Sequence, residues 1–266
     1  MKIGIDAGGT LIKLVILDDE NRTFKKYPST DIDQVIEILN NDYSEEEVYL
    51  TGGKSEYIQE KLNFESKISI EFDATFRGLT QLLNESNLNF ERYVYLNVGT
   101  GTSFHQATTT DQKRVGGSGV GGGTLLGLSH LLTGIEDYHT IIERAKKGDR
   151  NKVDLKVHHI YNGKPTPIPG DLTASNFGNV LNHKSDQSIE DQLIAVIGLV
   201  AETVTAMALN LADAFDTKKM VFIGSTLLDN TVMTDIIYNY SQLKGAEAYV
   251  VPNGEFSGAL GAIETN

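Results

Sequence analysis

The feature that most constrains the fold is a junction that occurs twice: a short apolar run, a glycine turn and a second short run. The first copy turns at Asp6-Ala7-Gly8-Gly9-Thr10, and the second turns at Val98-Gly99-Thr100-Gly101-Thr102-Ser103. Two short runs around such a turn predict a pair of antiparallel strands. One copy in each half of the chain predicts an α/β fold that is duplicated.

The two halves share almost no sequence identity, so the repeat lies in the order of their elements. We expect a first lobe over residues 1–91 and a second over residues 92–266, each with a mixed β-sheet flanked by helices. The expected strands are Lys2–Asp6, Lys13–Leu17, Arg22–Tyr27, Val48–Thr51, Lys67–Glu71, Tyr93–Asn97, Phe104–Thr108, Met220–Gly224 and Ala248–Val251. The expected helices are Asp31–Asn40, a segment around Ile58, Asp73–Glu85, Thr124–Leu132, Tyr138–Lys146, Ile189–Phe215 and Ser257–Ile263, with an irregular insertion over Asn151–Asp171.

Composition excludes several classes of protein. The 266 residues include no Cys, which excludes a disulfide framework, a Cys-based zinc site and a catalytic thiol. The formal charge of −13 argues against binding to nucleic acid or to anionic lipid, since phosphate contacts need clustered Lys and Arg. The N-terminus lacks a secretory signal, and no run approaches the ~18 apolar residues of a membrane span. We therefore expect a soluble, cytoplasmic protein.

The glycine turns have the chemistry of a phosphate site. Glycines expose backbone N–H groups, and Asp6 at the end of the first strand could order the water shell of a Mg²⁺ ion. Lys13 could add a positive charge. A glycine hairpin capped by an Asp is the alternative for the first turn alone, but two such turns could clamp a phosphate chain from both sides. Two further glycine junctions, Gly116–Gly127 and Gly224-Ser225-Thr226, follow in the second half.

Two other glycine motifs are weaker. Gly52-Gly53-Lys54-Ser55 resembles the end of a Walker A loop, but Val48 stands where that motif needs its first Gly. Residues 117–122 fit G-x-G-x-x-G, yet no clear strand precedes them and no acidic residue follows at the dinucleotide spacing. Neither motif predicts a nucleotide site by itself.

The glycine motifs together resemble the phosphate and adenosine motifs of the superfamily that contains acetate and sugar kinases, the heat-shock ATPase and actin. Within that superfamily the chain resembles the type II pantothenate kinases, especially the compact bacterial ones. The resemblance covers essentially the whole chain. It rests on Gly4–Lys13, Glu71-Phe72-Asp73-Ala74, Asn97–Ser103, Arg114-Val115-Gly116-Gly117 and Pro169–Gly178. It implies a duplicated actin-like ATPase fold, related to ribonuclease H.

The resemblance also implies roles for individual residues. Glu71 matches the general base, although alone it would be an ordinary surface acid. Thr100, Ser103 and Arg114 match residues that hold pantothenate, and Asp6 matches the acid that reaches Mg²⁺ through water. The residues that match the ATP site are Asp6, Ala7, Gly8, Gly9, Thr10, Leu11, Ile12, Lys13, Thr100, Gly122, Gly123, Thr124, Leu125, Leu126, Tyr138 and Ser225.

The implied activity is ATP-dependent phosphorylation of pantothenate to 4'-phosphopantothenate, the first step towards coenzyme A. A sugar or amino-sugar kinase of the same superfamily is one alternative, which the lack of Cys disfavours because its repressor-type branch carries a Cys-rich zinc motif. A non-catalytic, actin-like nucleotide switch is the other, and we expect no extra partner segment before Asp6. The resemblance further implies a homodimer, for which the helix Ile189–Phe215 offers either a surface or a core.

Overall fold

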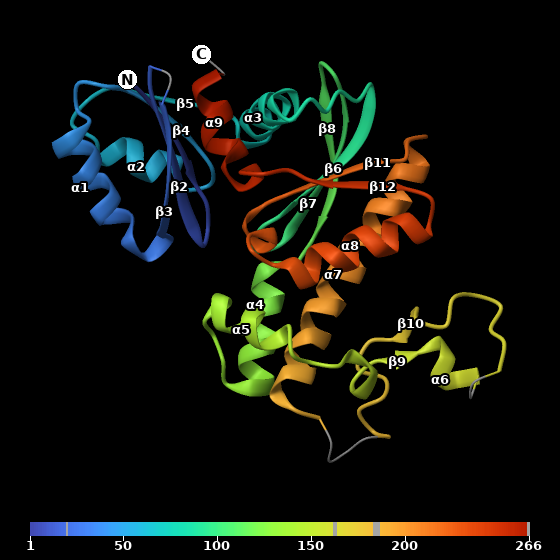
Figure 1. Ribbon diagram of the computed structural model, residues 1–266. Helices are drawn as coiled ribbons and strands as arrows, with labels where there is room; N and C mark the ends of the chain where they lie inside the picture. The colour runs from blue at the N-terminus through green and yellow to red at the C-terminus, as the bar shows by residue number, and fades with distance from the viewer. Residues whose placement is uncertain (20, 162–163, 183–186, 265–266) are drawn as a thin grey trace.

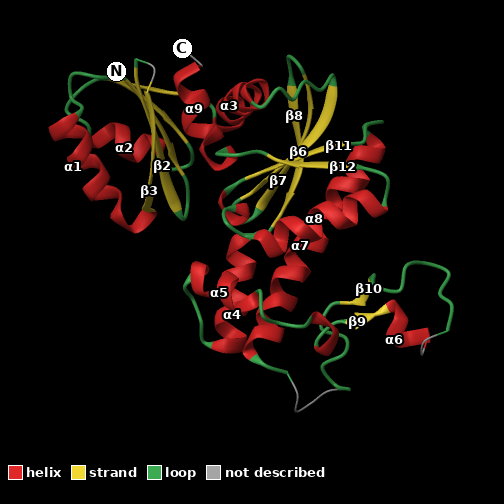
Figure 2. Ribbon diagram, viewed as in Figure 1, coloured by secondary structure: helices red, strands yellow, loops and turns green. Residues whose placement is uncertain are grey.

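The computed structural model describes residues 1–19, 21–161, 164–182 and 187–264, and it contains two five-stranded sheets of the same topology (Figures 1 and 2). In each sheet three consecutive antiparallel strands are extended by two parallel ones, in the orders β3-β2-β1-β4-β5 and β8-β7-β6-β11-β12. The first sheet consists of β1 (Lys2–Ala7), β2 (Leu11–Asp18), β3 (Asn21–Pro28), β4 (Glu47–Thr51) and β5 (Ser66–Ile68). The second consists of β6 (Arg92–Val98), β7 (Thr102–Thr108), β8 (Gln112–Ser118), β11 (Lys219–Ile223) and β12 (Glu247–Val250). The expected duplication is confirmed.

Helices cover both sheets and connect them (Figure 2). In the first lobe they are α1 (Ile32–Asp42), α2 (Ser55–Lys61) and α3 (Glu71–Glu85). The second half of the chain contributes α4 (Gly122–Thr133), α5 (Tyr138–Ala145), α6 (Val157–Tyr161), α7 (Ile189–Ala214), α8 (Thr231–Leu243) and α9 (Ser257–Glu264). Short 3-10 turns occur at Ser29–Asp31, Arg150–Lys152, Ser225–Leu227 and Gly254–Phe256, and a small hairpin pairs β9 (Leu155–Lys156) with β10 (Thr173–Ser175).

The two lobes share a layer formed by α3 and α9, which lie between the sheets (Figure 1). Although α9 ends the chain, it packs on β1 and β4 of the first sheet as well as on α3. The approach is so close that a Cβ on Gly78 would lie 2.0 Å from the Ser257 carbonyl oxygen. Glycine at that position therefore allows two helix backbones to touch and brings the sheets together.

The apolar helix α7 belongs to the core of the second lobe. Contrary to the expectation from sequence, it is long and apolar enough to span a membrane. Its buried residues, among them Leu193, Val200 and Ala208, pack with strands β6 and β11 and with α4, α5 and α8. The Ala and Gly content of α7 correctly predicted close packing against other helices. Its length and apolar composition are those of a core helix.

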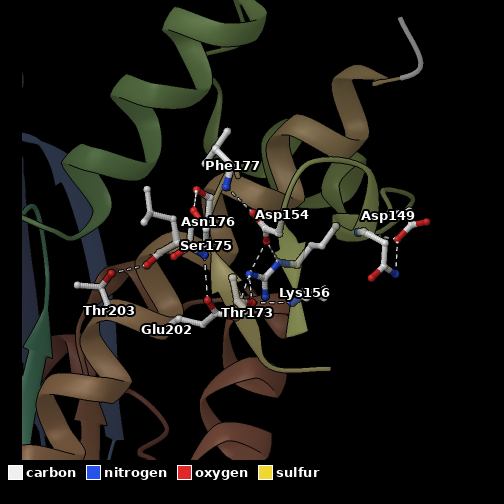
Figure 3. A network of polar contacts seen from close by, with 12 residues as sticks. Asp149, Asp154, Lys156, Thr173, Ser175, Asn176, Phe177, Glu202 and Thr203 are labelled. Carbon is white, nitrogen blue, oxygen red and sulfur yellow. Dashed lines mark hydrogen bonds and ion pairs between the residues drawn. The ribbon is translucent and has the colours of Figure 1, made fainter. Parts of the chain in front are cut away.

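The segment that precedes α7 is irregular, as expected, yet a buried polar network fixes it on that helix (Figure 3). The Arg150 guanidinium lies 2.6 Å from the Asp154 carboxylate and 2.9 Å from the Glu202 carboxylate of α7. Glu202 also accepts hydrogen bonds from the Thr173 hydroxyl at 2.7 Å and from the Asn176 side-chain amide at 2.9 Å. Because the buried Asp154 and the partly buried Arg150 and Glu202 are paired, the segment is held in place with little regular structure.

Besides the short elements α6, β9 and β10, the sequence did not predict β8 and α8. Strand β8 is an edge strand with mostly exposed residues and two glycines near its end, so it lacks the alternation of a half-buried strand. Helix α8 did carry a signal: Asn230 caps it, and Met233 and Ile237 follow at helical spacing. The expected strand Lys67–Glu71 was wrong in extent and burial, because β5 ends at Ile68 and is largely exposed.

Candidate active site

The two glycine turns face each other across a cleft of about 910 Å³ between the lobes. The Thr10 hydroxyl of the first turn lies 2.8 Å from the Thr100 hydroxyl of the second, so the turns are in direct contact. The cleft is lined from the first lobe by Asp6, Gly8, Gly9, Thr10, Leu11, Lys13, Lys26, Glu71 and Phe72. It is lined from the second lobe by Asn97, Gly99–Ser103, Arg114, Gly117–Gly119, Gly122, Gly123, Leu126, Tyr138, Ser225, Thr226 and Leu228.

The first turn places a carboxylate and an ammonium group side by side. Asp6 and Lys13 are register partners on β1 and β2, and the Lys13 ammonium nitrogen lies 3.4 Å from Asp6 Oδ2. Gly52, which follows β4, passes this carboxylate with φ of 90°. A Cβ there would lie 2.7 Å from Asp6 Oδ1, so the Gly52-Gly53 motif makes room for Asp6 and belongs to no Walker A loop.

The second turn has the same geometry with uncharged side chains. Asn97 and Ser103 are register partners on β6 and β7. Gly224, which follows β11, has φ of 111°, and a Cβ there would lie 2.4 Å from the Val98 carbonyl oxygen. Since Gly224 carries no side chain, the backbone after β11 can pass this close to the second turn.

Helix α4 begins against the second turn, but its first N–H groups already have partners. The Gly122 amide donates to the Gly99 carbonyl and the Gly123 amide donates to the Thr100 carbonyl, both at 2.8 Å. These two amides are therefore not available to a ligand. Here the glycines let α4 lie against the turn: a Cβ on Gly122 would lie 2.5 Å from the Thr226 hydroxyl.

Glu71 reaches the cleft from the first residue of α3. Partial burial raises the pKa of its carboxyl above the ordinary glutamate value, and the Asp6 carboxylate raises it further. Lys13 and Arg114 act in the opposite direction and lower this pKa. Glu71 therefore belongs to one electrostatic group with the charges of both lobes.

Arg114 extends the cleft at the same end. It lies on β8, and the centre of its guanidinium group is 5.2 Å from the centre of the Phe72 ring. Gly117 lies below it, since a Cβ at that position would come within 2.9 Å of Arg114 Nη2. A forked cation on an aromatic ring, close to Glu71, suits a carboxylate ligand.

The other end of the cleft is less polar. Leu126, Tyr138 and Leu228 line it together with Ser225 and Thr226. The Tyr138 hydroxyl donates to the Thr226 carbonyl at 2.5 Å, which fixes its ring as a wall of the cleft. An apolar wall of this kind suits a purine base, with phosphates directed towards the two turns.

The structure brings most of the predicted site residues to one cleft. Exceptions are Ala7, Ile12 and Leu125, which are wholly buried in the cores, and Thr124, whose hydroxyl donates to the Gly119 carbonyl. Residues at the cleft that sequence reasoning missed are Lys26, Phe72, Asn97, Thr102, Thr226 and Leu228. Phe72, Asn97, Thr102 and Thr226 stand within the quoted motifs but had no role assigned to them, whereas Lys26 arrives through its register pairing with Lys13 between β2 and β3.

Solved structures share this architecture. The chain superposes on (R)-2-hydroxyglutaryl-CoA dehydratase component A of Acidaminococcus fermentans with a TM-score of 0.64, at 18% identity and over 98% of this chain and 95% of that one. It superposes on a ROK family glucokinase from Streptomyces griseus with a TM-score of 0.57, at 14% identity and over 99% and 98% of the two chains. The chain has the two-lobed, actin-like fold of this class of ATPases and kinases.

Sequence comparison identifies the family. The family model described as Fumble matches residues 18–265. The type II pantothenate kinase of Staphylococcus epidermidis is 47% identical over 264 residues, which are 99% of each chain, and that of Staphylococcus aureus is 48% identical over 99% of this chain and 98% of its own. The chain belongs to the Fumble family of type II pantothenate kinases. Its substrates are pantothenate and ATP, and its reaction lies in coenzyme A biosynthesis, which decides against the sugar kinase and switch alternatives.

Proposed function

We propose that Glu71 is the general base for phosphorylation of the primary hydroxyl of pantothenate. The observation that carries the proposal is the position of its carboxylate in the cleft with Asp6 and Arg114, where its pKa is raised by burial and by the Asp6 charge. A carboxylate with a raised pKa is a stronger base and accepts a proton more readily. As the hydroxyl oxygen bonds to the γ-phosphorus of ATP, its proton passes to Glu71 and ADP leaves.

The remaining roles follow from the two ends of the cleft. Arg114 pairs with the pantothenate carboxylate, and Thr100 and Ser103 hold the rest of that substrate. The base of ATP lies beside Leu126, Tyr138 and Ser225, and its phosphates lie between the two turns. Lys13 offsets the charge that develops on the phosphoryl oxygens. The Thr10 and Thr100 hydroxyls, which now bond each other, would turn towards the phosphates.

The residues present fit a Mg²⁺ ion. Nucleotide-bound Mg²⁺ keeps most of its water and needs one or two carboxylates besides the phosphates, and Asp6 offers one beside the first turn. Within the described residues no group of three or more His, Asp or Glu side chains could hold a metal ion by itself. When bound, the ion would neutralise part of the charge of the phosphates, and Asp6 would hold it through water.

Substitution of Glu71 by Gln tests the base. We expect kcat to fall about 10²- to 10⁴-fold, since Gln cannot accept the proton, while KM for ATP stays within a factor of about two. Glu85→Gln, at the opposite end of α3, is the matched control and should keep wild-type kcat. Steady-state assays of ADP release measure both, and wild-type turnover in Glu71→Gln would exclude this residue as the base. A homodimer and a cytoplasmic location complete the proposal.

A further inference from the structure

Beneath the pantothenate end of the cleft lies a buried histidine that no proposed role has used. His105 is wholly buried on β7, two residues after Ser103 and on the same face of the strand. Its ring stacks on Tyr95 with 4.3 Å between ring centres and 8° between planes, and its centre is 5.4 Å from that of Phe72. Both ring nitrogens have partners: Nδ1 lies 2.9 Å from Gln112 Oε1, and Nε2 lies 3.0 Å from the Ser103 hydroxyl.

A series of hydrogen bonds runs from Asp73 through Gln112 and His105 to Ser103, and the Asp73 carboxylate at its end sets the direction of each bond. The Asp73 carboxylate can only accept, so Gln112 directs its amide nitrogen there, at 3.5 Å. The Gln112 oxygen then faces His105, with the Tyr95 hydroxyl as a second donor at 3.5 Å, so His105 Nδ1 must carry a proton. Burial lowers the pKa of His105 to about 4, which keeps the ring neutral and leaves Nε2 without a proton.

The last bond of the chain sets the role of Ser103. Because Nε2 can only accept, the single proton of the Ser103 hydroxyl points into the protein. Its lone pairs then remain for the cleft, which Ser103 lines. The hydroxyl is thus fixed as an acceptor of hydrogen bonds, and it cannot donate to a ligand without losing its hydrogen bond to His105.

We propose that His105 is a positioning residue that fixes the Ser103 hydroxyl as a hydrogen-bond acceptor, so that this subsite selects substrates with an N–H or O–H group at that point. The inference rests on the proposed role of Ser103 in holding pantothenate, whose amide and hydroxyl groups are such donors. This series of hydrogen bonds begins at Asp73, two residues after Glu71. It therefore also connects the strand that holds the substrate to the helix that carries the base.

A double-mutant cycle tests the proposal. We expect Ser103→Ala and His105→Phe each to raise KM for pantothenate about tenfold, with KM for ATP unchanged, because each removes the oriented acceptor. His105→Gln, whose amide oxygen can replace Nε2 as the acceptor, should stay within about threefold of wild type. The decisive variant is the double mutant, in which His105→Phe should raise KM for pantothenate no further than Ser103→Ala alone does.

Each other outcome would overturn the inference. If His105→Phe raises KM for pantothenate as much in the Ser103→Ala background as in wild type, His105 acts on the fold and not through Ser103. If Ser103→Ala leaves this KM unchanged, the role of Ser103 also fails, whereas the Glu71→Gln result still decides on the base. Should thermal melting show that His105→Phe is unfolded, Gln112→Met on the half-exposed edge strand replaces it in the cycle, with an expected rise of about threefold.

Discussion

The two glycine turns are the same structure built twice with different charges. Asp6 and Lys13 form the register pair at the end of the first sheet's central hairpin, and Asn97 and Ser103 form the equivalent pair in the second. A glycine at positive φ follows the neighbouring parallel strand in both sheets and lies against the Asp6 or Asn97 side-chain oxygen, where a Cβ would come within 2.7 Å. Duplication therefore preserved the backbone, while function required an ion pair in one copy and neutral groups in the other.

The charge difference assigns distinct tasks to the lobes. A carboxylate beside a lysine suits phosphate and its metal ion, and we place that task in the first turn. Neutral groups suit a phosphate chain that already faces one carboxylate, because a second one would repel it. This also accounts for a chain with net charge −13 that binds two anions: backbone N–H groups, hydroxyls and a few cations meet them locally.

Making the first turn resemble the second should have the largest effect. We expect Asp6→Asn to lower kcat about 10²- to 10³-fold, since the loss of one preorganised charge at a reacting phosphate is of that size. The residual activity should need more Mg²⁺ for half-saturation. Asp18→Asn, an exposed acid at the far end of β2, is the matched control and should change neither quantity. An unchanged Mg²⁺ dependence in Asp6→Asn would break the assignment of the metal to the first lobe.

The shared backbone predicts matched losses of stability. Gly52→Ala and Gly224→Ala should each destabilise the protein by about 2–4 kcal/mol, because a Cβ adds a clash to the strain of positive φ. Gly245→Ala, with φ of 71° but open space around it, isolates the strain and should cost about 1 kcal/mol. Gly53→Ala, in open space without positive φ, should cost almost nothing. Urea unfolding measures all four, and an effect in only one lobe would contradict the equivalence.

The reverse exchange should have a smaller effect. Asn97→Asp makes the second turn resemble the first, and we expect it to raise KM for ATP about tenfold, since the new carboxylate repels the phosphates. Asn97→Ala removes the amide without adding charge and separates the two contributions. The assay is ADP release at varied ATP. If Asn97→Asp binds ATP as well as wild type does, the neutrality of the second turn has no role in nucleotide binding.

The sequence predicted the duplication because both junctions are local: a strand, its glycine turn and the next strand lie within 17 residues, 2–18 in one copy and 92–108 in the other. The equivalence of Gly52 with Gly224 was not predicted, since it depends on which strand lies beside β1 and which beside β6. Local patterns carry no information on that pairing.

The site was predicted less completely than the fold, for a related reason. Motifs identify a stretch of chain but not which side chains of that stretch face the cleft. Ile12 alternates with Leu11 and Lys13 along β2, so its side chain points into the core while theirs line the cleft. His105 faces Ser103 from the same strand, but Gln112 reaches His105 only through the pairing of β7 with β8, an edge strand without an apolar pattern.

The smallest expected effect is on the pH dependence of kcat, which compares how a cation from each lobe acts on the pKa of Glu71. Its pKa is raised by burial and by Asp6, so kcat should fall on acidification at a pH above the ordinary glutamate range. Lys13 from the first lobe and Arg114 from the second both lower this pKa, and the influence of Lys13 is the larger. Removing either cation makes the carboxyl harder to ionise, so both Lys13→Met and Arg114→Gln should move the acid limb of kcat to higher pH, Lys13→Met further. Profiles of kcat against pH at saturating ATP and pantothenate measure this shift. If the acid limb moves to lower pH in either variant, ionisation of Glu71 does not control kcat.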